Sequence, residues 1–407
     1  MNIGYIWQQP AVDFTQTGAP QLHMRGVIHG LQKLGHTVRI ITYYQGTPHY
    51  SDDFRHWHPI AVNYTHPLKR PIQSIQGRLK LPYFNYFTNQ AFAQAILAAM
   101  PSADLFYERF HLMHYGAMFA CRQLKVPLVY EVNGDIVAEQ KEFNIKTNRG
   151  QWPITKKLTK YAFKQATKII AVGETIRQRT IESWAVDPHK VVVVPNGTDV
   201  ELFVNSDQTL PPQLQAYDFS PPTIVFVGGF QPWHGVDLIT RAFHELSQHH
   251  PTAQLLLVGD GPQITNIEQM VAKHNLQQRV IFAGRINHRY LPAILQAVDI
   301  AVIYHPSSAA NLVESPLKIY EYMAAGKAVV APDFPHMQKI IDHQQTGILA
   351  PPDNPTALAA CWQKLLDNPD LINRLGQAAQ KQAITHHSWL ATARKVNTHL
   401  LTLTTTS

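Results

Sequence analysis

Short apolar runs alternate with longer helical stretches along most of the chain. The runs at residues 2–7, 36–43 and 223–227 are rich in Ile, Val and aromatic side chains. Such runs are typical of strands that are covered on both faces of a parallel sheet. The stretches at residues 21–34 and 236–248 are predicted helices, and the second has a clear apolar face. The pattern predicts an α/β fold in which parallel strands alternate with helices.

The alternation restarts about half-way along the chain, which indicates two domains. At 407 residues the chain is long enough for two separate cores. A Pro-Asn-Gly turn follows the last apolar run of the first half, and residues 205–222 are rich in Pro, Gln, Ser and Asp, as linkers are. We therefore predict a first domain over residues 1–204 and a second over residues 205–387.

Polar side chains follow two predicted strands of the first half. Glu108 and Arg109 come after one strand, and Glu131 and Asn133 come after the next. In an open α/β sheet such residues line the ligand crevice, so they are candidates for the wall of a binding site. The other interpretation is structural: Arg109 ties the two loops together through an ion pair with Glu131 or Asp135.

One segment of the second half places charged residues in the first turns of a short helix. Ser315 is a predicted N-cap, Pro316 occupies the first helical position, and Gly326 ends the helix. A cation in the first turn, such as Lys318, costs about 0.3–1 kcal/mol against the helix dipole. A phosphate bound at the helix N-terminus would reverse that sign. The alternative is an exposed ion pair between Lys318 and Glu321, three residues apart.

The same segment resembles the donor-site signature of the family-4 retaining glycosyltransferases, which have the GT-B fold. The family pattern Pro-Leu-Lys-x-x-Glu-Tyr-Met-Ala-x-Gly-Lys is matched by Pro316, Leu317, Lys318, Glu321, Tyr322, Met323, Ala324, Gly326 and Lys327. The first Glu of the family's Glu-x7-Glu element would fall at Val313, whereas Glu314 stands one residue later. The resemblance implies two doubly wound, Rossmann-like domains facing a central cleft. It also implies that a last helix, at about residues 388–407, packs back on the first domain.

The resemblance implies roles for several residues in binding a nucleoside-diphosphate sugar. Glu321 would bind the ribose hydroxyls, and Lys318 and the helix N-terminus would bind the diphosphate. Glu314 is the candidate contact to the hydroxyls of the donor sugar. The family's Arg and Lys in the first loop of the second domain align with Gly229 and His234. We expect either that a protonated His234 neutralises the diphosphate of the bound donor or that an uncharged His234 donates a hydrogen bond.

The candidate residues form two overlapping sets. The catalytic candidates are Glu314, Lys318, His234 and Asn133. The donor-binding candidates are Gly18, Gly229, His234, Gly261, Arg285, Ser315, Pro316, Leu317, Lys318 and Glu321. Gly18 precedes a predicted helix, where a glycine allows a phosphate to approach the backbone, although the second glycine often found beside it is missing. Gly261 lies in a Val-Gly-Asp-Gly-Pro turn that, in the family, lies near the nucleotide base.

We expect neither a metal nor a cofactor; the nucleotide sugar is a substrate. The pair His111 and His114 has helical spacing but no third ligand nearby. Cys121 and Cys361 are far apart and in no ligand spacing, which indicates a reducing compartment and no disulfide. No run of the chain is long enough to span a bilayer, and no signal peptide is expected, so the predicted location is cytoplasmic.

The net charge of +7 is concentrated in two basic clusters of the first half. They consist of Lys69, Arg70, Arg78 and Lys80, and of Lys141, Lys146, Arg149, Lys156, Lys157, Lys160, Lys164 and Lys168. Basic side chains interleaved with aromatic ones suit an anionic membrane surface or an acidic acceptor, although a solvated helix face is the other interpretation. No nucleic-acid-binding motif accompanies them, so nucleic acid is not an expected partner.

The sequence thus predicts a metal-independent, retaining hexosyltransferase that uses a nucleoside-diphosphate sugar. The expected acceptor is a glycan or glycolipid, such as a lipid-linked or envelope glycan, and the protein would associate peripherally with the inner face of the membrane. Two alternatives remain open at this point. One is a catalytically silent GT-B scaffold, which the missing Arg–Lys pair favours. The other is a non-hydrolysing sugar-nucleotide epimerase of the same fold.

Overall fold

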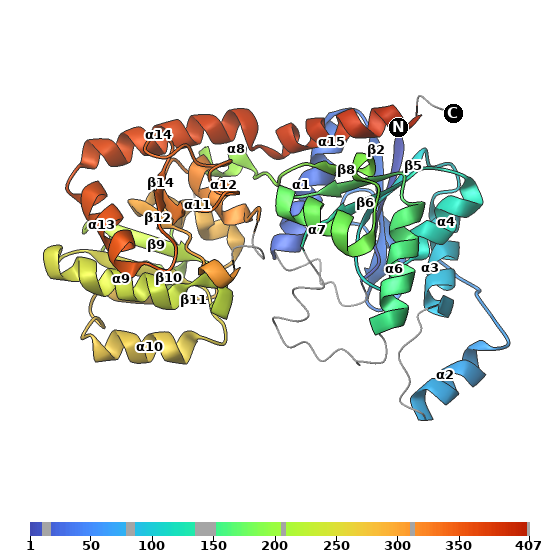
Figure 1. Ribbon diagram of the computed structural model, residues 1–407, viewed down its shortest axis with the longest axis horizontal. Helices are drawn as coiled ribbons and strands as arrows, with labels where there is room; N and C mark the ends of the chain where they lie inside the picture. Colours follow the sequence, from blue (N-terminus) through green and yellow to red (C-terminus); the bar gives the residue numbers. More distant parts are fainter. Residues whose placement is uncertain (10–17, 79–85, 135–151, 205–208, 310–313, 405–407) are drawn as a thin grey trace. The chain divides into compact units, whose positions relative to one another are not determined.

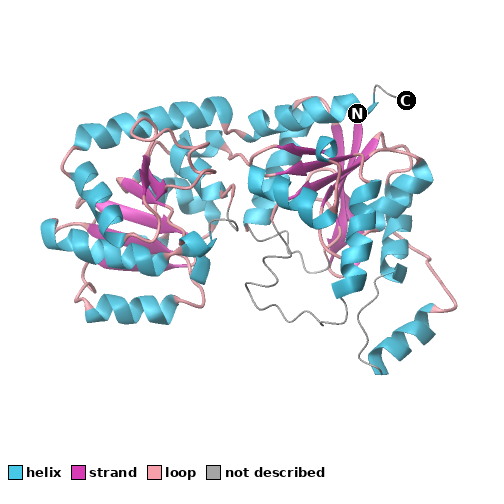
Figure 2. Ribbon diagram, in the orientation of Figure 1, coloured by secondary structure: helices cyan, strands magenta, loops and turns pink. Residues whose placement is uncertain are grey.

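A computed structural model describes residues 1–9, 18–78, 86–134, 152–204, 209–309 and 314–404 (Figure 1). The chain forms two compact units. The first comprises Met1–Pro195 and Thr392–Ser407, and the second comprises Asn196–Ala391. In each unit helices cover both faces of a largely or wholly parallel sheet (Figure 2). This arrangement confirms the predicted α/β fold with two Rossmann-like domains.

The first unit is built on a sheet with the strand order β4-β3-β2-β1-β5-β6-β7-β8. The strands are β1 (Asn2–Trp7), β2 (Thr37–Tyr44), β3 (Thr47–Ser51), β4 (His58–Pro59), β5 (Leu105–Arg109), β6 (Leu128–Val132), β7 (Lys168–Ala171) and β8 (Val191–Val193). The helices are α1 (Ala19–Lys33), α2 (Lys69–Arg78), α3 (Tyr86–Ala99), α4 (Gly116–Leu124), α6 (Trp152–Gln165), α7 (Glu174–Trp184) and most of α15 (Trp389–Thr404). A short 3₁₀ helix spans Pro188–Lys190.

The second unit has a parallel sheet with the order β11-β10-β9-β12-β13-β14. Its strands are β9 (Thr223–Val227), β10 (Gln254–Val258), β11 (Val280–Gly284), β12 (Ile300–Val302), β13 (Ala328–Pro332) and β14 (Ile348–Ala350). Its helices are α8 (Val200–Val204), α9 (Val236–His249), α10 (Ile264–Lys273), α11 (Leu291–Gln296), α12 (Leu317–Ala324), α13 (Pro355–Leu366) and α14 (Pro369–His386). Short 3₁₀ helices span Pro212–Leu214, Pro232–His234, His288–Tyr290 and Ser307–Ala309.

The apolar strands of the second unit are buried on both faces because their side chains alternate between two cores. Val225 in β9 packs into one core with residues of α11, α12 and α14. Its neighbours Ile224 and Phe226 pack into the other core with residues of α9, α10 and α13. This two-sided burial explains why these strands are continuous apolar runs.

The structure corrects several predicted elements. The antiparallel pair β3 and β4 extends the first sheet, and the sequence analysis did not predict it. Gln45 and Gly46 have φ values of 51° and 80°, as a two-residue hairpin turn requires. Glu108 and Arg109 lie inside β5 and Glu131 lies inside β6, not beyond their ends. The predicted last helix, at about residues 388–407, is present as α15.

Some residues named above lie outside the part of the chain that the structure describes. They are Lys80, Asp135, Lys141, Lys146, Arg149 and Val313. The described basic residues of the two clusters lie on or next to α2, α6 and β7.

Candidate functional site

Most of the candidate residues follow strands at the carboxyl edge of the second sheet. The chain runs outward from β9 to β10 and β11, and then crosses to β12 on the other side of β9. The strand order therefore reverses between β9 and β12. Open α/β sheets bind ligands outside such a reversal. The loop after β9 and the N-terminus of α12, which follows β12, both belong to this edge.

Three glycines hold the loops after β9 and β10 against each other. Gly228 and Gly259 have φ values of +154° and +137°, a region that L side chains rarely adopt. A Cβ atom on Gly259 would lie 1.9 Å from the carbonyl oxygen of Gly228, and one on Gly261 would lie 2.7 Å from the amide nitrogen of Phe230. Gly261 thus packs against protein backbone. Gly229 differs, because the nearest atom to its Cβ position is 3.6 Å away and a side chain would fit there.

Lys318 places a buried ammonium group beside this loop. Its Nζ atom has no hydrogen-bond partner among the described residues. It lies 4.6 Å from the ring centroid of Phe226, and a Cβ on Gly228 would lie 2.5 Å from it. Burial lowers the pKa of Lys318 to about 8, while the charge of Glu321 acts to raise it. The interpretation of Lys318 and Glu321 as an exposed surface pair is therefore wrong.

Glu321 is buried on α12 and is held by a histidine from another loop. His288 lies in the short helix after β11, and its Nε2 atom is 2.7 Å from Glu321 Oε1. This contact fixes the orientation of the carboxylate. His288 was not among the predicted residues, although its place just beyond a strand of the same sheet was a signal for it.

His234 is uncharged in the free protein. Its Nδ1 atom lies against the carbonyl oxygen of Gly229. Burial and the nearby charge of Lys318 lower the pKa of His234 to about 4, although the Gly229 carbonyl acts to raise it. His305 lies beside it, with ring centroids 5.7 Å apart. Protonation of His234 on donor binding therefore stays a prediction, and the free protein holds the neutral form.

The start of α12 differs from the prediction. The helix begins at Leu317, which is half-buried, and Pro316 is its N-cap residue with φ −70° and ψ 127°. No side chain caps it. Ser315 is engaged elsewhere, because its Oγ atom accepts a hydrogen bond from the backbone of Asn196 and its carbonyl oxygen accepts one from the Asn196 side chain. Glu314 is buried just before this helix.

The remaining candidates do not join this cluster. Arg285 is exposed after β11. Gly18 is the N-cap residue of α1 in the first unit, with ordinary extended φ and ψ values. Asn133 also belongs to the first unit, where its side-chain amide donates to Glu131 Oε1. Arg109 contacts the same oxygen at 3.4 Å, so the predicted structural tie between these strands is present.

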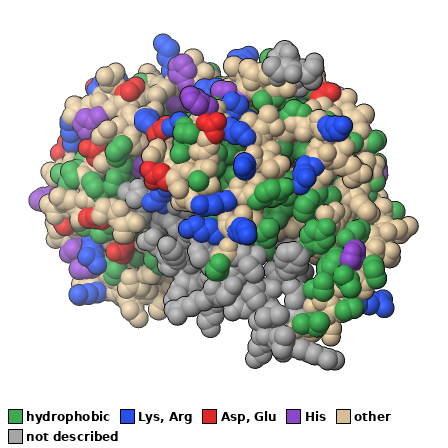
Figure 3. All heavy atoms as spheres, turned by 45° about the vertical axis from the view of Figure 1, so that its right-hand side comes forward, with side chains coloured by type: hydrophobic (Ala, Val, Ile, Leu, Met, Phe, Trp, Pro, Cys, Tyr) green, Lys and Arg blue, Asp and Glu red, His purple; other side chains and the backbone are tan. Residues whose placement is uncertain are grey.

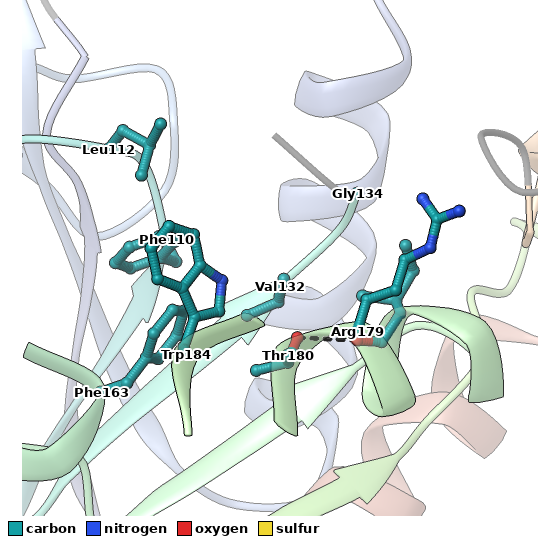
Figure 4. Close-up of a pocket in the computed structure, with 9 residues that line it drawn as sticks. Phe110, Leu112, Val132, Gly134, Phe163, Arg179, Thr180 and Trp184 are labelled. Atoms are coloured by element: carbon teal, nitrogen blue, oxygen red, sulfur yellow. Dashed lines mark hydrogen bonds between the residues drawn. The ribbon is translucent and has the colours of Figure 1, made fainter. Parts of the chain in front are cut away.

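A small cavity lies in the first unit near the end of β6 (Figure 4). Its volume is about 10 Å³, which is room for about one water molecule. It is lined by Phe110, Leu112, Val132, Gly134, Phe163, Ile176, Arg179, Thr180 and Trp184. The Thr180 hydroxyl donates to the Ile176 carbonyl oxygen at 2.7 Å. This cavity is too small to hold a sugar.

Two family descriptions match the chain. "Glycosyltransferase Family 4" matches residues 21–202, and "Glycosyl transferases group 1" matches residues 213–382. Together the matches cover most of both units, including the cluster around Lys318. The chain belongs to the family-4 glycosyltransferases of the GT-B type.

This glycosyltransferase is similar in sequence to two named transferases. It is 24% identical to an alpha-D-kanosaminyltransferase of Streptomyces kanamyceticus, over 63% of this chain and 66% of that protein. It is 27% identical to a phosphatidyl-myo-inositol mannosyltransferase of Mycobacterium tuberculosis, over 56% of this chain and 57% of that protein. The aligned parts of these two relatives are therefore less than two thirds of their length.

Solved structures show the same fold over the whole glycosyltransferase. The Anabaena protein HepE, in complex with UDP and glucose, has a TM-score of 0.70 at 16% identity, covering 99% of this chain and 100% of that one. Sucrose-phosphate synthase of Thermosynechococcus elongatus has a TM-score of 0.68 at 21% identity, with 100% of both chains covered. In the described part of the glycosyltransferase, no helix combines the length and apolar character that a bilayer crossing needs.

Proposed function

We propose that the protein transfers a hexose-type sugar from a nucleoside-diphosphate sugar to a hydroxyl group of an acceptor, with retention of configuration and without a metal. The observation that carries this proposal is the buried ammonium of Lys318, which lacks a hydrogen-bond partner among the described residues and lies against Gly228. An unpaired buried charge is costly, and a bound anion would offset that cost. The uncapped N-terminus of α12 favours the same anion.

The chemistry of sugar transfer calls for a fixed cation at this position. When the bond between the anomeric carbon and the diphosphate breaks, negative charge grows on the leaving group. Fixed cations and N–H groups that face this charge lower the barrier. Lys318 supplies the ammonium, and Gly228, which has no side chain, leaves room for it. Because the family's Arg position is Gly229 here, Lys318 carries a larger share of this stabilisation than the family pattern alone implies.

The two carboxylates near α12 are assigned to binding, not to covalent catalysis. Glu321, oriented by His288, accepts hydrogen bonds from the ribose hydroxyls, and Glu314 accepts from the donor sugar. The acceptor oxygen then bonds to the anomeric carbon on the face that the diphosphate leaves. The departing phosphate oxygen takes the proton of the acceptor hydroxyl. This same-face substitution retains the configuration without a covalent enzyme intermediate.

A lipid-linked or glycolipid acceptor at the inner face of the membrane suits the first unit. Relatives of this chain are named for phosphatidyl-myo-inositol and phosphatidylinositol substrates. Leu68 and Ile75, on and next to the basic helix α2, are 54% and 51% exposed. Basic and hydrophobic side chains lie next to one another on the face shown in Figure 3. Such surfaces bind anionic membranes through apolar burial and charge together.

Nucleotide sugars test the proposal directly. The protein is incubated with UDP-glucose, UDP-N-acetylglucosamine and GDP-mannose and with lipid and free-glycan acceptors, and release of the nucleoside diphosphate is measured. Replacing Lys318→Ala should lower kcat/KM by about 100-fold or more, since one fixed electrostatic donor is lost. Lys273→Ala, which changes an exposed lysine of α10, is the matched control and should have no effect.

The other possible outcomes separate the alternatives. Isomerisation of the donor without transfer would favour an epimerase. Absence of both reactions with every donor would favour a silent scaffold. Equal activity of the Lys318→Ala variant and the control would contradict the assignment of the diphosphate to α12.

A further inference from the structure

His305 is a buried histidine of the second unit with one ring nitrogen unused. It lies just after β12 and is 1% exposed. Its Nδ1 atom is 2.9 Å from the carbonyl oxygen of Trp233. Its Nε2 atom has no hydrogen-bond partner among the described residues. Buried polar atoms are usually satisfied, so this nitrogen calls for an explanation.

The contact with Trp233 determines what the free nitrogen can do. A carbonyl oxygen only accepts hydrogen bonds, so Nδ1 must carry the proton of the neutral ring. Nε2 of the neutral ring is then a lone-pair acceptor. Burial lowers the pKa of His305 well below its ordinary value, and the neighbouring Lys318 on α12, His234 after β9 and His336 after β13 lower it further. Among the described residues, these are the titratable groups that act on it, and none of them is a carboxylate, so the ring remains neutral at physiological pH.

A neutral hydrogen-bond acceptor can bind the sugar hydroxyls of the proposed donor but not its phosphate oxygens. Phosphate oxygens that carry no hydrogen would be repelled by the lone pair on Nε2. The hydroxyl groups of a sugar can donate to it. We propose that His305 is a specificity-determining residue that accepts a hydrogen bond from one hydroxyl of the transferred sugar, an inference that rests on the proposed function.

The surroundings of His305 fit a group rich in hydroxyls. His336 is buried nearby, and its Nε2 atom also lacks a partner within the described structure. The charge of Glu314, the carboxylate assigned to the sugar, acts on His336. The charge of Lys318, to which the diphosphate is assigned, acts on His305 itself. The cluster therefore combines a cation for phosphate with neutral acceptors for hydroxyls.

Two variants of His305 distinguish the role of Nε2 from that of Nδ1. In His305→Asn the side-chain amide can still donate to the Trp233 carbonyl, but nothing replaces Nε2. In His305→Gln the longer side chain can place its oxygen where Nε2 was. His274→Gln, on another loop after α10, is the control for replacing a histidine of this unit.

The measurements compare a nucleotide sugar with its nucleoside diphosphate. Dissociation constants are measured for UDP-glucose, UDP-N-acetylglucosamine and GDP-mannose and for UDP and GDP, together with kcat/KM. The Asn variant should bind UDP and GDP within about twofold of wild type, whereas kcat/KM with the active sugar nucleotide should fall about 10- to 100-fold, as for a lost specific hydrogen bond. The Gln variant should recover most of this loss.

Deoxygenated donors identify the hydroxyl. Removing one sugar hydroxyl at a time from the active donor should reveal one position at which wild type loses activity and the Asn variant loses no more. Such non-additivity is the signature of a direct contact. The proposal is overturned if the Asn variant loses affinity for UDP or GDP as strongly as for the sugar nucleotide, or if it behaves as wild type. If wild type transfers sugar from none of the donors, the proposed function itself fails.

Discussion

Buried polar side chains without a hydrogen-bond partner occur in two different settings in this protein. Lys318 and His305 lie at the carboxyl edge of the second sheet, and the proposed donor would supply their missing partners. Glu108 is different, because it is fully buried inside β5, in the first unit. Neither of its carboxyl oxygens has a partner in the described part of the structure. Burial raises the pKa of Glu108 well above its ordinary value, so it is a neutral acid inside an apolar core.

Glu108 should make the stability of the first unit depend on pH. The pKa of Glu108 in the folded state is above the unfolded value of about 4.3, so the folded protein binds one more proton than the unfolded chain. The free energy of unfolding therefore falls as pH rises from about 4.3 toward the folded-state pKa. The loss is at most about 1.4 kcal/mol per pH unit. Glu108→Gln should remove this decline. Amide exchange of β5 and β6 between pH 5 and pH 7 measures it.

Glu174→Gln changes an exposed glutamate of α7 in the same unit and serves as the control. If the Glu108→Gln variant lost protection with pH as steeply as wild type and this control, another group would be responsible.

Lys318 should determine how activity depends on pH at the alkaline side. Its ammonium has a pKa of about 8, and the charged form binds the diphosphate, so kcat/KM should fall as pH rises through about 8. In Lys318→Arg this fall should disappear below about pH 10, because guanidinium stays charged. His234→Gln should keep the fall, since His234 is already neutral with a pKa of about 4. A pH–rate profile from 6 to 10 for the three proteins decides which residue titrates.

At the scale of elements, the loops after β9 and β10 depend on the absence of side chains. Gly259→Ala would place a Cβ 1.9 Å from the Gly228 oxygen at a φ of +137°. We expect a loss of more than about 2 kcal/mol in the free energy of unfolding of the second unit. Gly229→Ala is the control, because its Cβ would meet no atom closer than 3.6 Å. Thermal unfolding of both variants measures the difference, and equal melting temperatures would contradict it.

The sequence predicts elements well where burial is two-sided. The covered strands of both sheets appear as apolar runs because residues such as Ile224 and Val225 face different cores. The hairpin strand β3 is only partly buried, so it has no such run. Glu108 and Arg109 were placed beyond a strand because charged side chains usually lie outside one. Local hydropathy does not report that tertiary structure can bury them.

The candidate site was predictable only where it is local in sequence. Lys318 and Glu321 share one helix and one motif, so spacing alone places them together. His288 and His305 reach the same place from other loops, and no local pattern joins them to α12. Ser315 was assigned to capping because it precedes a helix, but Asn196, 119 residues away, takes its hydroxyl. Tertiary contacts outweighed the local preference.

At the scale of the whole molecule, the C-terminal helix completes the first unit. Val396 and Leu400 of α15 are buried, and the Asn397 side chain lies 2.8 Å from the His36 ring. The presence of two domains was predictable from the chain length and from the second series of strands. The packing of the last helix on the first domain was predictable only from the family resemblance. The boundary lies at Pro195 instead of residue 204, because Asn196 is bonded to Ser315 in the second unit.

Removing residues 392–407 should therefore destabilise the first unit. Each buried apolar side chain that is lost contributes about 1.5–3 kcal/mol. We expect faster amide exchange in α1 and β2, while β9 to β14 of the second unit keep their protection. Removing only residues 405–407 is the control. Unchanged exchange in the longer truncation would show that α15 adds nothing to the core.

The backbone joins the start and the end of the second unit. Thr198 accepts a hydrogen bond from the Trp389 amide at 3.0 Å and donates one to the His387 carbonyl at 2.8 Å. The two ends of the second unit are thus neighbours. Domains whose ends lie close together can be inserted or exchanged with little effect on the rest of the protein. If the proposed function is right, swapping residues 196–391 between related enzymes should transplant donor preference as one genetic module and leave acceptor choice with the recipient.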